Sequence, residues 1–171
     1  MPKDAQVVAV PEAFDVFYRR EFRPMVALAY ALSGSRYAAE DLAQEAFVAA
    51  ARQWDRIGRY EAPGGWVRRV VANKSVSLYR RKAAEARAVS RVALQRQTPL
   101  PELSASDDEF WSHVRALPRK QAQAIALHYL EDRPVSEVAE ILGCAESTAK
   151  VHLHKGRKNL AMRIGAEVER S

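Results

Sequence analysis

The segment VHLHKGRKNL, residues 151–160, gathers side chains that could do two different kinds of chemistry. In a strand, His152 and His154 would project from one face and could bind a metal ion together. In a helix, the two histidines would point apart, and the neighbouring cations Lys155 and Lys158 would form a surface suited to phosphate groups. The conformation of this segment therefore decides which chemistry is open to the chain.

The composition limits the class of protein. The chain has 171 residues, of which 48% are hydrophobic and 28% charged, a mixture typical of folded globular proteins. The single Cys144 excludes an internal disulfide framework, and a Cys-x-x-Cys zinc motif is absent from the sequence. The sequence contains neither a secretory signal pattern nor an apolar run of the roughly 20 residues that span a bilayer. We expect a cytoplasmic protein without membrane insertion.

The net charge of +6 is unevenly distributed along the chain. Residues 61–100 contain nine Lys and Arg against two Asp and Glu, and residues 147–171 contain six against two. Residues 101–146 reverse the sign, with four against nine. Solvated helix faces alone would explain any one of these runs. Two separate basic blocks favour nucleic acid as a partner, because a polyanion attracts cations only where it touches the protein.

Apolar residues recur at three- and four-residue spacing through the N-terminal part of the chain, which predicts helices. A first helix opens after Pro11 and stops at SGS, residues 33–35. A second follows at about 36–55, and the loop DRIGRYEAPGG separates it from a third at about 66–81. Since no strand-like alternation occurs, the expected fold is all-α.

The predicted domain organisation is two small helical domains, 10–82 and 107–166, joined by a flexible linker at 83–106 that is poor in large apolar residues. Ser106 begins an SDDE capping box, which predicts the start of the second domain's first helix. Pro118 starts another helix, which EDRP ends.

The C-terminal part of the second domain has the pattern of a helix-turn-helix. A short helix runs through Leu142, Gly143 forms the turn, and a longer helix starts at about Ser147. At about 100° per residue, the longer helix separates an apolar side from a basic side. The apolar side contains Ala149, Leu153, Gly156 and Leu160, and the basic side contains Ser147, Val151, His154, Lys155 and Lys158. A plain helical hairpin is the simpler alternative, but the charge placement favours DNA.

Four stretches resemble one protein family. They are AEDLAQEAFVAAARQW, GGWVRRVVANKSVSLYRR, LPRKQAQAIALHYLED and VAEILGCAESTAKVHLHKGRKNL. In this order and at this separation they resemble bacterial RNA polymerase sigma factors of the extracytoplasmic-function (ECF) group of the sigma-70 family. The resemblance covers roughly 14–81 and 110–160. It implies that the N-terminal domain is sigma region 2 and the C-terminal domain is sigma region 4.

The resemblance also implies roles for particular residues. Docking on the clamp of the polymerase β′ subunit is implied for Asp41, Gln44 and Glu45. Recognition and melting of the minus ten element is implied for Arg59, Tyr60, Arg68, Arg69, Asn73 and Lys74, a mixture of cations and an aromatic ring that suits single strands. Recognition of the minus thirty-five element in the major groove is implied for Ser147, Lys150, Val151, His154, Lys155 and Lys158. The helices that precede this last set would meet the polymerase β flap.

The sequence departs from the family pattern at several of these sites. Ser77 stands where many relatives have aspartate, and Pro134 stands where relatives often have a serine cap. Relatives commonly have serine in place of Val151 and arginine in place of Lys155. Because a lysine does not form the two-pronged arginine contact to guanine, the promoter preference is expected to differ from that of better-matched members.

The function implied is therefore promoter-specific transcription initiation, without catalysis by this chain. The sequence contains no catalytic triad and no phosphate-binding glycine loop, and APGGW lacks the ending of a P-loop. We expect no cofactor and no metal. The expected partners are core RNA polymerase, promoter DNA in double-stranded and melted form, and an anti-sigma factor.

Two other functions remain open at this point. The chain could be a helix-turn-helix repressor or activator that never contacts polymerase, although such a protein would not need the N-terminal block. It could instead be a metal-dependent enzyme that uses His128, Cys144, His152 and His154, which metal analysis of the purified protein would test.

Overall fold

The computed structural model describes residues 10–88 and 105–170, and every regular element in these ranges is helical. The predicted all-α fold class is therefore confirmed for the described residues. The predicted linker at 83–106 begins as the end of a long helix, and its residues 89–104 lie outside the described residues. No helix in the described ranges combines the length and the apolar character needed to cross a membrane.

The N-terminal bundle consists of α1 (Phe14–Ser33), α2 (Arg36–Arg52), α3 (Trp54–Ile57) and α4 (Pro63–Ala88). Gly34 ends α1 with φ +70°, and the Ser35 hydroxyl caps α2 by accepting a hydrogen bond from the Ala38 N–H at 3.3 Å. The helix predicted at 36–55 is divided at Gln53. The helix predicted at 66–81 is longer at both ends: it starts at Pro63, since proline suits a first helical position, and it continues to Ala88.

The C-terminal bundle consists of α5 (Ala105–Arg115), α6 (Arg119–Ile125), the π-helical turn η1 (Ala126–Leu130), α7 (Val135–Leu142) and α8 (Glu146–Val168). Pro118 precedes α6, as predicted, but α5 begins at Ala105, one residue before the predicted start at Ser106. The chain leaves η1 through Asp132, which has φ +52°.

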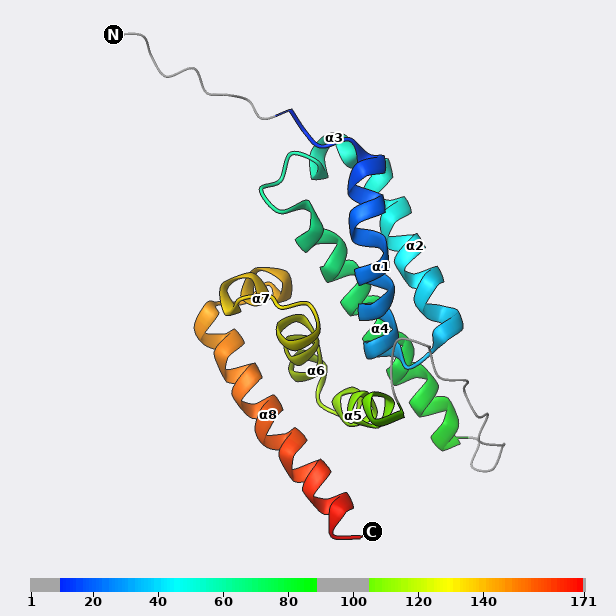
Figure 1. The fold of residues 1–171 in the computed structure, drawn as a ribbon, viewed down its shortest axis with the longest axis vertical. Coiled ribbons are helices and arrows are strands. Elements are labelled where there is room, and N and C mark those ends of the chain that lie inside the picture. The colour runs from blue at the N-terminus through cyan, green and yellow to red at the C-terminus, as the bar shows by residue number, and fades with distance from the viewer. Residues whose placement is uncertain (1–9, 89–104, 171) are drawn as a thin grey trace.

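The two bundles lie side by side (Figure 1). Within the first, α1 packs against α2 and α4, and within the second, α6 and α7 pack against α8. Contacts between the bundles join α4 to α7 and α1 to both α5 and η1. Helix α8 runs along the outer edge of the second bundle, on the far side from α2.

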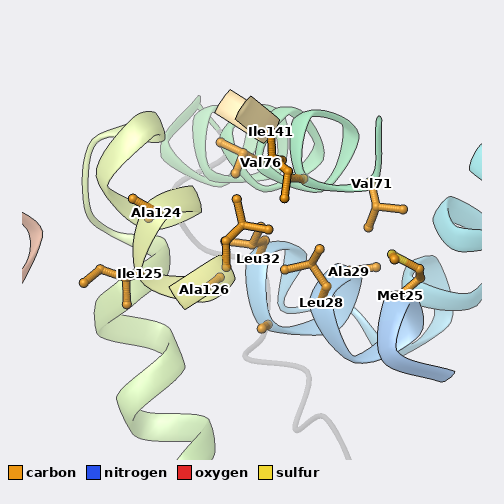
Figure 2. Packing of buried hydrophobic residues seen from close by; sticks show 14 of the residues in the cluster. Met25, Leu28, Ala29, Leu32, Val71, Val76, Ala124, Ile125, Ala126 and Ile141 are labelled. Carbon is orange, nitrogen blue, oxygen red and sulfur yellow. The ribbon is translucent and has the colours of Figure 1, made fainter. Parts of the chain in front are cut away.

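The buried apolar side chains of both bundles form one continuous cluster. Figure 2 shows Leu28 and Leu32 of α1 in the same packed interior as Val71 of α4 and Ala126 of η1. All four are at most 1% exposed. The domain interface is therefore part of the core, since burial of this apolar area stabilises the contact between the bundles.

Candidate nucleic-acid interface

Helix α8 carries the first candidate surface, and the turn before it sets its direction. Gly143 ends α7 in the left-handed conformation with φ +70°, a region that favours glycine, and α8 begins two residues after Cys144. The predicted apolar side is confirmed, because Ala149, Leu153, Gly156 and Leu160 are all buried. At Gly156 an added Cβ would lie only 3.0 Å from Ile125 Cγ1, so the missing side chain lets α8 approach α6 closely.

The opposite side of α8 is open to solvent. All six residues predicted to read the minus thirty-five element are exposed, namely Ser147, Lys150, Val151, His154, Lys155 and Lys158. Lys150 lies 3.7 Å from the Glu146 carboxylate one turn earlier, an exposed ion pair of small energetic value. This side, which we call the α8 stripe, presents the exposed cations Lys150, Lys155 and Lys158, and positive charge of this kind attracts phosphate groups.

Residues 151–160 are helical, so the side chains of His152 and His154 point in different directions. His154 is exposed on the α8 stripe, whereas His152 is half-buried at its edge. Burial lowers the pKa of His152, and the charges of Lys120 and Lys155 lower it further. The lowered pKa disfavours the charged form of His152, so this side chain contributes less positive charge to the stripe than a fully solvated histidine would.

The four ligands of the metal-enzyme alternative are not gathered into one site in the described part of the chain. His128 Nδ1, for example, lies 2.8 Å from the Arg133 carbonyl oxygen. Among the described residues, the one group with metal-ligand potential is Glu109, His113 and Glu167, whose ligand atoms lie within 4.8 Å of one another. The two glutamates are exposed. Because Glu167 lies more than 50 positions after Glu109 and His113, the sequence alone did not indicate that these three residues meet.

The second candidate surface lies on α4 and on the turn before it. Arg59, Tyr60, Arg69, Asn73 and Lys74 are exposed. Arg68 is not: it is 4% exposed, although the sequence interpretation expected it to face a single strand. The structure therefore separates Arg68 from the other residues predicted to read the minus ten element.

Arg68 is held between two carboxylates from different bundles. Its Nε donates a hydrogen bond to Glu131 at 2.6 Å, and its Nη2 donates one to Glu21 at 2.7 Å. The side chains of Arg68, Glu21 and Glu131 are only 5%, 14% and 4% exposed. Buried charges of this kind are retained only when they are paired and hydrogen-bonded.

Asn73 also contacts the C-terminal bundle. Its Oδ1 accepts a hydrogen bond from Gln123 Nε2 at 2.9 Å, and Arg119 Nη2 donates to the hydroxyl of nearby Ser77 at 2.7 Å. Lys74 points elsewhere and lies 2.7 Å from the Glu45 carboxylate of α2. The residues predicted for the minus ten element are thus divided among three environments.

The three residues predicted to dock on polymerase, Asp41, Gln44 and Glu45, are exposed on one face of α2. They line a single shallow pocket of about 560 Å³ together with Val48 and Lys74. Trp66, near the start of α4, is partly buried and packs against the apolar cluster. Glu131 and Gln123 were missed by the sequence interpretation, because single polar residues in a helical pattern carry no signal of a distant partner.

Family models match most of the described chain. The one described as "Sigma-70 region 2" matches residues 17–85, and the one described as "Sigma-70, region 4" matches residues 108–160. The first covers α1 to most of α4, and the second covers most of α5 to the middle of α8.

Curated relatives are similar over most of the chain. An ECF RNA polymerase sigma factor, SigE of Mycolicibacterium smegmatis, is 28% identical over 162 residues, which are 89% of this chain and 62% of SigE. SigW of Bacillus subtilis is 27% identical over 80% of this chain and 81% of SigW. SigM of Mycobacterium tuberculosis is 28% identical over 94% of this chain and 82% of SigM.

A solved structure has the same fold. It is the sigma factor RpoE of Bartonella quintana in complex with the anti-sigma factor NepR, with a TM-score of 0.68 and 23% identity over 89% of this chain and 96% of RpoE. The two region models, in the order and over the helices described above, together with these relatives place the chain in the ECF group of the sigma-70 family.

Proposed function

We propose that this chain binds core RNA polymerase and directs promoter-specific initiation of transcription, with residues 10–82 acting on the minus ten element and 107–166 on the minus thirty-five element. Residues 83–106 connect the two. The observation that carries the proposal is the exposed, basic α8 stripe behind a left-handed glycine turn, in a chain that also has the region 2 helices.

The α8 stripe is proposed to enter the major groove. Lys155 and Lys158 would contact phosphate or single base acceptors, and Val151, which is 47% exposed, offers an apolar contact to a thymine methyl group. Ser147, Lys150 and His154 complete the proposed surface. Since phosphate contacts position a protein and base contacts specify the sequence, Val151 and His154 are the residues expected to set preference.

The turn before α4 and the exposed face of α4 are proposed to hold the melted non-template strand. Tyr60 is 40% exposed and supplies a ring on which a base can stack, while Arg59, Arg69 and Lys74 supply positive charge. Asn73 belongs to the same proposed surface, whereas Arg68, predicted for it from the sequence, is buried between Glu21 and Glu131 and is not exposed to the strand in this structure. Capture of unstacked bases there would offset the cost of melting.

Polymerase docking is proposed for Asp41, Gln44 and Glu45 on the β′ clamp, and for the helices before α8 on the β flap. RNA synthesis then belongs to the core enzyme, and this chain acts in the cytoplasm without catalysis of its own. The solved RpoE is in complex with an anti-sigma factor, and we propose a partner of that class for this chain as well.

The test is reconstituted transcription on a fragmented genomic library, with purified core polymerase and mapped start sites. We expect a restricted set of starts that share two upstream motifs. A matched pair of variants sharpens the result: Lys155→Ala should reduce transcripts from these starts, and Arg163→Ala, beyond the proposed stripe on the same helix, should not. An active core that gives no promoter-specific transcripts would overturn the proposal.

The repressor alternative makes a different prediction in the same system. A conventional helix-turn-helix regulator would protect promoter DNA from cleavage in the absence of core polymerase and would not create new start sites. The exposed polar face of α2, which such a regulator does not need, favours the sigma-factor proposal over this alternative.

A further inference from the structure

Three side chains that can bind a metal ion meet where α5 packs against the last turns of α8 (Figure 1). His113 Nε2 lies 3.1 Å from Glu167 Oε2, and a carboxylate oxygen of Glu109 completes a group whose atoms lie within 4.8 Å of one another. Glu109 and His113 are four residues apart on α5, the spacing that places two metal ligands on one face of a helix. The fold therefore brings one imidazole nitrogen and two carboxylates together from two helices.

The distances within this group suit a zinc-sized ion. Zn²⁺ binds imidazole nitrogen and carboxylate oxygen at about 2.0–2.2 Å, so two ligand atoms of a tetrahedral site lie about 3.4 Å apart. The separation of 3.1 Å between His113 and Glu167 is close to that value. Glu109 needs to move inward by no more than about 1.4 Å, which an exposed side chain achieves by a change of rotamer.

The surroundings of His113 separate a metal site from a simple histidine–glutamate pair. His113 is only 8% exposed, so its ring is already fixed and loses little freedom when it binds an ion. A pocket of about 370 Å³ opens beside it and is lined by both His113 and Glu167. This space can hold the water molecules that complete the coordination of an ion with three protein ligands.

The charges around the pocket indicate which class of ion fits. Arg163 and Arg170 also line it, and they donate hydrogen bonds to the carbonyl oxygens of Ala116 at 3.3 Å and Ala166 at 2.9 Å. Their positive charge opposes a cation that is held by electrostatic attraction alone, as Mg²⁺ is. An imidazole nitrogen favours transition-metal ions such as Zn²⁺, and two carboxylates balance the charge of a divalent ion.

The group lies at an end of α8 that is otherwise weakly attached. The buried residues of α8 end at Leu160, and residues 161–168 are all exposed. An ion bound by Glu167 and by α5 would add a strong link exactly there. Glu167 also lies beyond residue 160, where the match to region 4 ends, so this group is no part of the pattern by which the chain was assigned to its family.

We propose that Glu109, His113 and Glu167 form a binding site for Zn²⁺ or a similar divalent transition-metal ion, which joins the end of α8 to α5. Binding stabilises the folded C-terminal bundle, because the unfolded chain does not gather the three ligands. The sequence-based expectation of no metal does not extend to this site, since its ligands meet only through the fold. The site lies away from the α8 stripe and does not depend on the proposed function.

The first test is calorimetric titration of the full chain with Zn²⁺, after removal of metal with a chelator. We expect one ion per chain. Glu167→Gln should weaken binding at least about tenfold, because loss of a ligand costs no less than loss of a supporting partner. Glu169→Gln, the same charge change at an exposed position two residues later, is the matched control and should bind like the wild type.

His113→Gln is a second variant, which removes the only nitrogen ligand of the site. It should also bind at least about tenfold more weakly than its control, His152→Gln. Circular dichroism shows whether each variant keeps its helix content. Should the buried His113→Gln fail to fold, Glu167→Gln still decides the question, because the Glu167 side chain is 50% exposed.

The second test is hydrogen exchange of the backbone amides in residues 161–168. Zn²⁺ should slow this exchange in the wild type and in Glu169→Gln, and it should have no effect in Glu167→Gln. Mg²⁺ at the same concentration should slow the exchange in none of them, because it lacks affinity for a nitrogen ligand.

Equal zinc affinities of Glu167→Gln and Glu169→Gln would overturn the site, as would an absence of binding to the wild type. Binding without protection of residues 161–168, or equal protection by Mg²⁺, would overturn it as well. Neither measurement involves DNA or polymerase, so these failures are distinguishable from failure of the proposed function, which would appear as an absence of promoter-specific transcripts.

Discussion

The α8 stripe and the basic face of α4 are both cationic surfaces on long helices, but they differ in how much of each is exposed to solvent. On α8 all six predicted residues face solvent. On α4 the central cation, Arg68, is buried between Glu21 and Glu131, and Asn73 is bonded to the neighbouring bundle. A basic surface in a sequence thus indicates where a polyanion can bind, whereas the state of that surface depends on what the rest of the chain packs against it.

The largest expected effect concerns the buried arginine. Arg68→Ala leaves two acidic side chains buried without their cation, and removal of one partner from such a group typically costs 3–5 kcal/mol. We expect a loss of about 3 kcal/mol in the free energy of unfolding, at the low end because separation of the bundles can rehydrate Glu131. Urea denaturation measures it. Arg69→Ala, one residue further and exposed, should change stability by less than about 0.5 kcal/mol; equal losses would contradict the distinction between the two sites.

The next effect concerns the turn between α7 and α8, which sets the direction of the α8 stripe. Gly143 has φ +70°, a conformation that costs a residue with a Cβ about 1–2 kcal/mol, and its added Cβ would also meet Arg69. Gly143→Ala should therefore lower the unfolding midpoint in urea and weaken DNA binding by α8. Gly165→Ala is the control, because an added Cβ there meets no atom within 4 Å and alanine favours helix. A stabilised Gly143→Ala would refute this account of the turn.

A third prediction separates phosphate contacts from base contacts on the α8 stripe. Lys158→Ala should weaken binding to all DNA sequences alike and reduce the slope of log affinity against log salt by about 0.9. Val151→Ala should change the preferred sequence and leave the slope unchanged. Titrations of duplex DNA at several salt concentrations measure both. An unaltered slope for Lys158→Ala would remove it from the phosphate-contacting set.

The smallest expected effect is the titration of His152 at the edge of the stripe. Its pKa is lowered by burial and by Lys120 and Lys155. A lowered pKa in the folded state means that this contribution to stability is present above the unfolded value of about 6.5 and is lost as pH falls through the folded pKa. NMR titration of the imidazole should show a pKa below 6.5, and Lys155→Ala should raise it. An unchanged pKa in Lys155→Ala would contradict the contribution of Lys155 and leave burial and Lys120 as the causes of the shift.

Sequence patterns predicted the outer face of α8 correctly because each residue's exposure there follows from its position around one helix. Leu153 and His154 are neighbours, yet one is buried and the other exposed, as a period of 3.6 requires. The helix ends were less predictable. Gln53 interrupts the second helix and Pro63 begins the fourth early, both through local backbone geometry.

The environment of Arg68 could not be predicted in the same way. Its partner Glu131 is 63 positions away, in a segment whose apolar spacing indicates only a helix. Pairing of that kind depends on how two bundles meet, and helix periodicity holds no information about it. The same limit applies to Gln123 and Asn73. The exposure of the candidate site on α8 could therefore be predicted from the sequence. The burial of Arg68 and the pairing of Asn73 on α4 could not.

The π-helical turn η1 at Ala126–Leu130, directly before Glu131, has a consequence for how such a protein can vary. A π turn holds one more residue than an α turn, so removal of one residue would let this turn close as α-helix and would change where Glu131 lies relative to Arg68. Glu131 would then leave Arg68 without any change of amino acid at either position. A deletion within these five residues could therefore change the contact between the two bundles in a related chain. The residues on the α8 stripe would stay the same.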